Sequence, residues 1–207
     1  MLFRSVAARG GTVHWCRDGE EACEAVLGIC RARGATAVAK GKSMVSEEIA
    51  LNDYLARHGI DAVETDLGEY ILQLRGETPS HIVMPAIHLT QDAIADTFRV
   101  HHATLDAGRS LDEARELTDE ARQTLRGTFL GTEIGITGAN FLIAETGTAV
   151  IVTNEGNSDL IQTLPPVHVV VTGIEKVIPT AADAFTLLRI LARSATGQEI
   201  SCYTTFA

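Results

Sequence analysis

Residues 135–157 read GITGANFLIAETGTAVIVTNEGN and are the stretch that decides the fold. Two short apolar runs, 141–144 and 149–152, flank Thr146-Gly147, which has the length and glycine content of a tight hairpin connection. We therefore predict two antiparallel strands. Because a strand rises about 3.3 Å per residue, Glu145 at the turn should lie about 15 Å from the open end of the hairpin. A small ligand can contact one of these places but not both.

The open end of the predicted hairpin gathers polar residues and glycines. Glycines there let the backbone turn sharply or approach a ligand closely. Asparagine and glycine are also common in turns that bind nothing, and this structural interpretation is the alternative. The residues that meet there are Thr137, Gly138, Asn140, Thr153, Asn154, Glu155, Gly156 and Asn157.

Strands and helices are predicted to alternate along the rest of the chain. Predicted strands are 12–15, 37–40, 61–64, 81–84 and 167–171, and predicted helices are 18–34, 46–59, 66–76, 90–102, 118–128 and 181–192. The charged stretch 109–116 is predicted to be a loop. This alternation indicates an α/β fold with a mixed, largely parallel sheet covered by helices on both faces. A single domain over residues 1–207 is expected.

Capping signatures mark several of the predicted helix starts. Asp18 with Glu21, and Asp66 with Glu69, have the spacing of a capping box, and Ser46 is placed as the cap of the next helix. Asp66 and Glu69 are accordingly interpreted as structural residues.

Composition excludes several classes of function. The net charge is −10 without any basic stretch, which argues against a nucleic-acid groove. The apolar runs are too short to span a membrane, so a cytoplasmic location is expected. Cys16, Cys23, Cys30 and Cys202 lack the spacing of zinc or iron–sulfur ligands, and we expect no metal site in this chain.

Lysines are scarce, which makes one pair conspicuous. The chain has fourteen arginines but only three lysines, and two of these, Lys40 and Lys42, precede Ser43 between a predicted strand and a predicted helix. Such strand-to-helix loops bind anions in α/β proteins, so a phosphate or carboxylate would suit this one. The alternative is that the lysines pair with Glu47 and Glu48 on the surface.

Six segments carry a resemblance to a known family. They are KGKSMVSEEIALN (40–52), VETDLGEYILQL (63–74), PSHIVMPAIH (79–88), residues 135–157 quoted above, LPPVHVVVTGIEKVIPT (164–180) and RSATGQEIS (193–201). In order and spacing they resemble the lactate utilisation protein B family, in the part called the LUD domain. The resemblance covers nearly the whole chain. It implies a fold of the NagB/RpiA/CoA-transferase type and a role in oxidising L-lactate to pyruvate within a multi-subunit iron–sulfur system.

The resemblance also implies what this chain lacks. Full-length members extend beyond this segment at both ends, and their ferredoxin-like cysteine motifs bind 4Fe-4S clusters, whereas this sequence stops at Ala207 without such motifs. We therefore expect no cofactor within this chain. The expected partners are other lactate-utilisation subunits and a small carboxylate or phosphorylated ligand.

Oxidation of a 2-hydroxy acid needs a base for the hydroxyl proton, a cation for the carboxylate and an electron acceptor. Lys40 and Lys42 are candidates for the cation, and Glu155, Glu145 and His88 are candidates for the base. The acceptor is expected outside this chain.

Two further interpretations stay open. The implied fold allows a transferase or isomerase-like enzyme that acts on an acyl or phosphorylated ligand with Glu145 or Glu155 as the active carboxylate. A docking module without catalytic activity is the other. His168, within an apolar strand, is interpreted as a hydrogen-bonded core residue.

Overall fold

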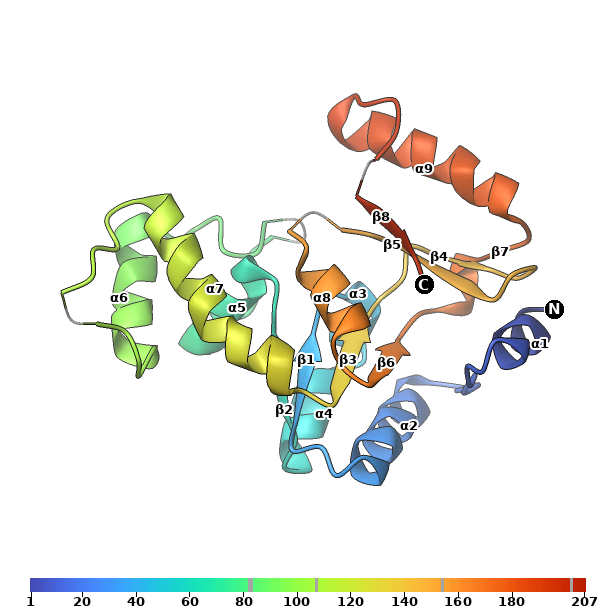
Figure 1. The fold of residues 1–207 in the computed structure, drawn as a ribbon, viewed down its shortest axis with the longest axis horizontal. Helices are drawn as coiled ribbons and strands as arrows, with labels where there is room; N and C mark the ends of the chain where they lie inside the picture. The colour runs from blue at the N-terminus through green and yellow to red at the C-terminus, as the bar shows by residue number, and fades with distance from the viewer. Residues whose placement is uncertain (82–83, 107, 154, 202) are drawn as a thin grey trace.

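The computed structural model describes residues 1–81, 84–106, 108–153, 155–201 and 203–207. These residues form two four-stranded sheets surrounded by helices (Figure 1). The predicted α/β class is therefore confirmed. In the described part of the chain, no helix combines enough length with enough apolar character to cross a bilayer.

The first sheet is parallel throughout. Its strands, in spatial order, are β2 (Asp61–Glu64), β1 (Ala37–Lys40), β3 (Ile134–Thr137) and β6 (Val167–Val170). Val38, Ile134 and Ile136 are fully buried in it. Because the strands are parallel, their carboxyl ends lie along one edge, and the segments that follow them are brought together there.

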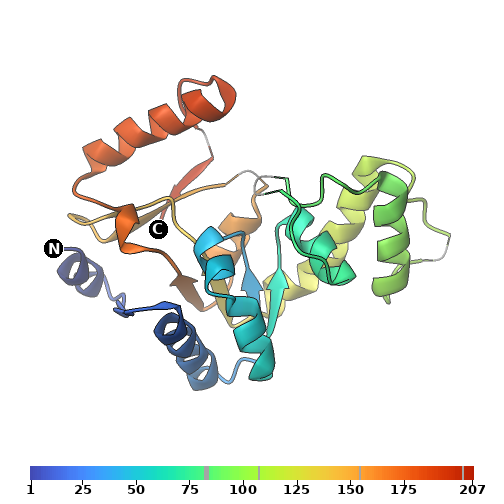
Figure 2. The ribbon, with the colours of Figure 1, turned by 180° about the vertical axis from the view of Figure 1, so that it is seen from behind.

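Helices cover both faces of this sheet. In the described part of the chain as a whole, the helices are α1 (Leu2–Ala8), α2 (Gly19–Ala32), α3 (Met44–Glu48), α4 (Leu51–Arg57), α5 (Leu67–Arg75), α6 (Gln91–His101), α7 (Ala114–Gly131), α8 (Asn157–Thr163) and α9 (Ala181–Thr196), with a 3-10 turn η1 (Ile174–Lys176). Helix α8 lies in front of the sheet in Figure 1, and α3 and α4 lie in front of it in the reverse view of Figure 2. Cys23 and Cys30 of α2 are buried on one helix face.

A glycine sets the distance between α8 and the sheet. A Cβ atom added to Gly135 of β3 would lie 1.9 Å from the carbonyl oxygen of Ile161 in α8. Only a residue without a side chain therefore fits at this position, and α8 packs directly on the strand backbone.

The predicted hairpin forms and belongs to the second sheet. Strands β4 (Phe141–Ile143) and β5 (Thr148–Val152) pair antiparallel, and Gly147 between them has a φ of +72°. The full strand order is β7 (Val177–Ile178), β4, β5 and β8 (Thr204–Phe206). Helix α9 packs on this sheet through Ala184 and Leu188. The hairpin was predicted to make a single sheet mixed, but it contributes to a separate mixed sheet.

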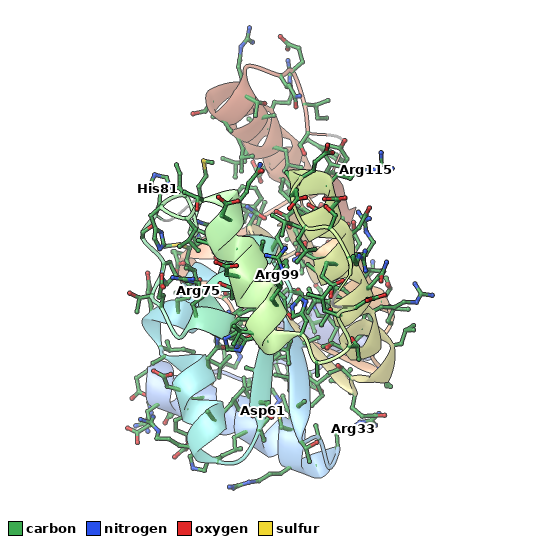
Figure 3. The ribbon with its side chains drawn as sticks, turned by 90° about the vertical axis from the view of Figure 1, so that its left-hand side faces the viewer. Arg33, Asp61, Arg75, His81, Arg99 and Arg115 are labelled. Carbon is green, nitrogen blue, oxygen red and sulfur yellow. The ribbon has the colours of Figure 1, made fainter. Side chains whose placement is uncertain are left out.

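Helices α5, α6 and α7 form a helical lobe with its own core around Phe98. A buried chain of hydrogen bonds ties the three helices together: the Tyr70 hydroxyl lies 2.9 Å from His102 Nε2, and His102 Nδ1 lies 3.0 Å from Glu120 Oε1. Figure 3 views this lobe, with Arg99 of α6 and Arg115 of α7 on its surface.

Several predicted boundaries were wrong. Residues 12–15 form no strand, and Trp15 is 61% exposed. The predicted helix 46–59 is broken into α3 and α4 at Ala50, which has a φ of +51°. Part of the predicted loop 109–116 is helical because a capping box between Glu113 and Glu116 starts α7 early. Strands β3, β7 and β8 were not predicted. The predicted strand 81–84 includes residues 82 and 83, which lie outside the described part.

Candidate functional site

A cleft of about 920 Å³ opens at the carboxyl edge of the parallel sheet. Segments that follow all four parallel strands line it: Lys42 after β1, Asp66 after β2, Gly138 after β3 and Val171 after β6. This edge is where ligands bind in open α/β sheets. The geometry of the fold therefore agrees with a binding site at this cleft.

The opposite wall comes from the second sheet and α9. It includes Ile151 of β5, Leu191 of α9 and Lys176 of η1. Met84 and Ile87, in the segment before α6, complete an apolar lining with a few polar groups. Such composition is typical of sites for small organic ligands.

Many of the predicted site residues converge on this cleft. Lining residues among those predicted are Lys42, Ser43, Thr137, Gly138, Asn140, Glu155 and Asn157. They come from the β1–α3 loop and from the open end of the hairpin. These two parts of the chain are almost a hundred residues apart in the sequence. The fold brings together the two groups that the sequence singled out separately. Asn154 lies outside the described residues.

Three predicted residues shape the backbone around the cleft. Ser43 Oγ accepts a hydrogen bond from the Ser46 backbone N–H at 3.3 Å, so Ser43, not the predicted Ser46, caps α3. A Cβ atom on Gly138 would lie 3.0 Å from Ser43 Oγ, which leaves little room for a side chain there. Gly156, with a φ of +77°, forms the N-cap position of α8.

The remaining candidates lie elsewhere. Lys40 is fully buried, and its Nζ lies 2.7 Å from Glu64 Oε1. Glu145 accepts a hydrogen bond from the Ala181 backbone N–H at 2.9 Å, at the start of α9. His88 Nε2 lies 2.9 Å from a Glu77 carboxylate oxygen. Lys40, Glu145 and His88 are not among the described residues that line the cleft.

His168 forms the side-chain hydrogen bond that was expected of it, but it is half-buried in β6 and is not the core residue that was predicted. Its Nε2 lies 2.8 Å from Thr137 Oγ1. Burial lowers the pKa of the imidazole to about 4, so it is neutral at neutral pH. It fixes the side chain of Thr137 at the end of β3.

Lys42 reaches a carboxylate on α5. Its Nζ lies 2.9 Å from Glu69 Oε1, and its side chain is 27% exposed. The partner is therefore Glu69 and not the expected Glu47 or Glu48. Burial raises the pKa of Glu69 to about 8; the neighbouring Asp66 raises it further and Lys42 partly opposes the shift. Glu69 therefore keeps its proton at neutral pH, which leaves the charge of Lys42 available for a ligand.

Two more carboxylates stand at the start of α5. Asp66 caps the helix as predicted, by accepting a hydrogen bond from the Gly68 backbone N–H at 3.2 Å. The predicted capping box is incomplete, because Glu69 turns to Lys42. Glu155 accepts a hydrogen bond from the Leu67 backbone N–H at 3.4 Å, and burial followed by the charge of Asp66 raises its pKa.

The sequence reasoning missed Asp66, Glu69 and Lys176 as residues of the site or next to it. Asp66 follows a parallel strand at its carboxyl end, which was an available signal, and Lys176 is one of only three lysines. Within the described residues, no group of three or more His, Cys, Asp or Glu side chains is arranged to hold a metal ion. The chemistry that the cleft offers is anion binding by lysine and proton transfer by carboxyl groups.

Comparison with known proteins adds relatives to this geometry. Residues 1–207 match the LUD domain. The chain is 46% identical over 206 residues to a protein named Lactate utilization protein B from Geobacillus thermodenitrificans, an alignment that covers 99% of this chain and 42% of that protein. It is 41% identical over 207 residues to a protein of the same name from Bacillus cytotoxicus, which covers 100% of this chain and 43% of the relative. The chain thus spans less than half the length of these relatives. No solved structure matches it, so the NagB/RpiA/CoA-transferase likeness stays a prediction.

Proposed function

The chain belongs to the LUD domain family, and we propose on that premise that it acts in lactate utilisation by binding L-lactate during its oxidation to pyruvate. The relatives named Lactate utilization protein B support this role. The observation that carries the proposal is the convergence of Lys42, Asn140 and Glu155 on one cleft at the carboxyl edge of the parallel sheet.

In this proposal Lys42 binds the carboxylate of lactate. Its ammonium group lies at the wall of the cleft, and its partner Glu69 retains a proton because burial raises the Glu69 pKa to about 8. Lys176, on the opposite wall, forms no ion pair within the described part of the chain and supplies a second cation. Glu155 lines the cleft and takes the hydroxyl proton of the ligand.

Oxidation of lactate to pyruvate breaks the O–H and Cα–H bonds and releases two electrons and two protons; Glu155 takes the hydroxyl proton, and the proton from Cα is released to water. We propose that 4Fe-4S clusters outside this chain accept the electrons, and that other lactate-utilisation subunits are partners in a cytoplasmic assembly. This chain then contributes the binding and the proton transfer.

Calorimetric titration with L-lactate and with pyruvate tests the proposal. Lys42→Met should weaken binding by about 10- to 100-fold, because a hydrogen bond to a charged group contributes about 1.5–3 kcal/mol. Lys42→Arg keeps the charge and should retain most of the affinity. Arg115→Ala is the matched control, since Arg115 is 89% exposed on α7 (Figure 3).

The same variants, placed in the full-length protein, should show the corresponding change in lactate oxidation. If Lys42→Met bound both ligands as tightly as the parent chain does, the proposal that Lys42 binds the ligand carboxylate would be wrong. If neither ligand bound the parent chain, the proposal that this cleft binds lactate would be wrong.

The size of the cleft favours a second candidate function. A volume of about 920 Å³ is in the range that holds ligands of drug size, and lactate has only six non-hydrogen atoms. A transferase or isomerase-like reaction on an acyl or phosphorylated ligand would use this volume, with Glu155 as the active carboxylate. Turnover of acyl-CoA or a sugar phosphate by the purified chain would favour this candidate over lactate binding.

A further inference from the structure

Three carboxyl groups gather at the start of α5, and a lysine contacts one of them. Asp66 caps the helix, Glu69 lies one turn further along it, and Glu155 reaches the same helix end from the segment before α8. Lys42 is bound to Glu69 at 2.9 Å. Capping explains Asp66, but it does not explain why two more carboxyl groups are held beside it.

The Glu69 carboxyl group is the most deeply placed member of this cluster. Its side chain is only 5% exposed. One oxygen, Oε1, contacts Lys42, whereas the other, Oε2, is buried without a hydrogen-bond donor. A buried carboxylate oxygen without a donor is costly, and the cost disappears if this oxygen carries a proton and donates it to a neighbour.

Asp66 is the neighbour that can accept such a hydrogen bond. A hydrogen bond between the side chains of Asp66 and Glu69 is one of the causes that raise the Glu69 pKa to about 8. Two carboxyl groups in contact cannot both be ionised without strong repulsion, so the pair retains one proton between them.

We propose that Asp66 and Glu69 form a proton-sharing pair that serves as a second acid–base site of the cleft, beside Glu155, for ligands that present a hydroxyl or carboxyl group. Asp66 lines the cleft and exchanges the proton with the ligand. Glu69 stands behind it as a positioning residue that holds the shared proton. The inference rests on the proposed function only in that the ligand enters this cleft.

The proton transfer is balanced within this arrangement. When a ligand hydroxyl is deprotonated, its O–H bond breaks and an O–H bond forms on Asp66, so that the pair carries two protons instead of one. In the opposite direction the pair returns that proton to the ligand oxygen. Glu155, whose pKa is raised by burial and by the charge of Asp66, lines the same cleft.

Titration of the side-chain carboxyl carbons by NMR tests the pair without any ligand. In the parent chain we expect one glutamate carboxyl that titrates near pH 8, and Glu69→Gln should remove it. Asp66→Asn keeps the helix cap, because asparagine caps as well as aspartate, and should lower the midpoint of Glu69 by about 1–3 pH units. Lys42→Met should raise it. Glu116→Gln, at a carboxyl group on α7 whose pKa is lowered, is the control and should leave the midpoint unchanged.

A functional measurement separates acid–base action from a merely structural ion pair. In the full-length protein, the pH profile of kcat/KM for lactate should have an arm near pH 8 that Glu69→Gln removes, with kcat reduced more than KM is changed. A Glu69 carboxyl that titrates near its ordinary value of 4.5, or a midpoint that Asp66→Asn does not move, would overturn the pair. Absence of lactate binding would overturn the proposed function alone, since the carboxyl titration does not depend on it.

Discussion

Replacement of Gly135 by alanine tests whether the backbone contact between β3 and α8 positions the cleft. The added Cβ atom would lie 1.9 Å from the carbonyl oxygen of Ile161 and 2.9 Å from its carbonyl carbon. Ordinary van der Waals contact begins at about 3.4 Å, so the two elements must separate by about 1.5 Å. The atoms that clash belong to a helix backbone, which cannot relieve the contact by a change of rotamer.

The structure suggests the size of the effect. Overpacking of a well-packed interior costs about 1–3 kcal/mol, and the upper end applies where backbone must move. For a chain of about this size, 1 kcal/mol corresponds to about 2–4 °C in Tm, so Gly135→Ala should lower Tm by about 6–12 °C. Gly28 in α2 is the matched control because no atom lies within 4 Å of its added Cβ. Gly28→Ala should raise the stability by up to about 1 kcal/mol.

Thermal and urea denaturation followed by circular dichroism compare the two variants. Gly135→Ala should also weaken ligand binding, because α8 begins at Asn157 and β3 ends at Thr137, and both residues line the cleft. A Tm within about 1 °C of the parent would refute the reasoning. So would a loss of the same size in Gly28→Ala, which would indicate a general intolerance of glycine substitution.

Three further predictions concern buried ionisable groups. The folded state holds the Glu69 proton more tightly than the unfolded chain does. The free energy of unfolding should therefore fall as pH rises from about 4.5 to about 8, by up to about 1.4 kcal/mol per pH unit. Urea denaturation should show that Glu69→Gln flattens this slope. Lys40→Met leaves the buried Glu64 without its cation and should lower the free energy of unfolding by about 3–5 kcal/mol. In a double-mutant cycle, Glu64→Gln in the same chain should restore part of this loss. Because the pKa of His168 is about 4, its imidazole binds a proton at a lower pH in the folded state than in the unfolded chain, so stability should fall as pH drops from about 6.5 to about 4. The NMR signals of this imidazole should titrate near pH 4. An imidazole midpoint near 6.5 would contradict the burial of His168.

Local patterns were sufficient for much of the fold. The strands at 37–40 and 61–64 and the hairpin were predicted at or within a residue of their observed bounds, because apolar runs bounded by turn residues are read from neighbours in the sequence. The strand β3 was missed because its sequence, IGIT, includes a glycine that normally weakens a strand. That glycine is present because α8 packs on it, which no local pattern reveals.

The sequence contains a signal for the ion pair that Lys40 forms with Glu64. The strands β1 and β2 read AVAK and DAVE, and they pair in parallel with Lys40 opposite Glu64. Opposite charges at the ends of two paired strands favour an ion pair between them. The alternation of strands and helices does not itself predict a register between the strands, so it does not distinguish Lys40 from Lys42. The structure buries the first and leaves the second at the cleft.

The capping-box spacing of Asp66 and Glu69 predicted the role of Asp66 but not the role of Glu69. Their spacing is that of a capping box, and Asp66 does cap α5. Glu69 departs from the rule because Lys42, which precedes it by 27 residues, lies 2.9 Å from its carboxylate and competes with the nearby backbone N–H. A buried carboxyl group that leaves its local partner for a distant lysine gives up a helix-capping contact. Such exceptions are expected at functional sites, where stability is exchanged for chemistry, and this one occurs beside the cleft that we propose as the binding site.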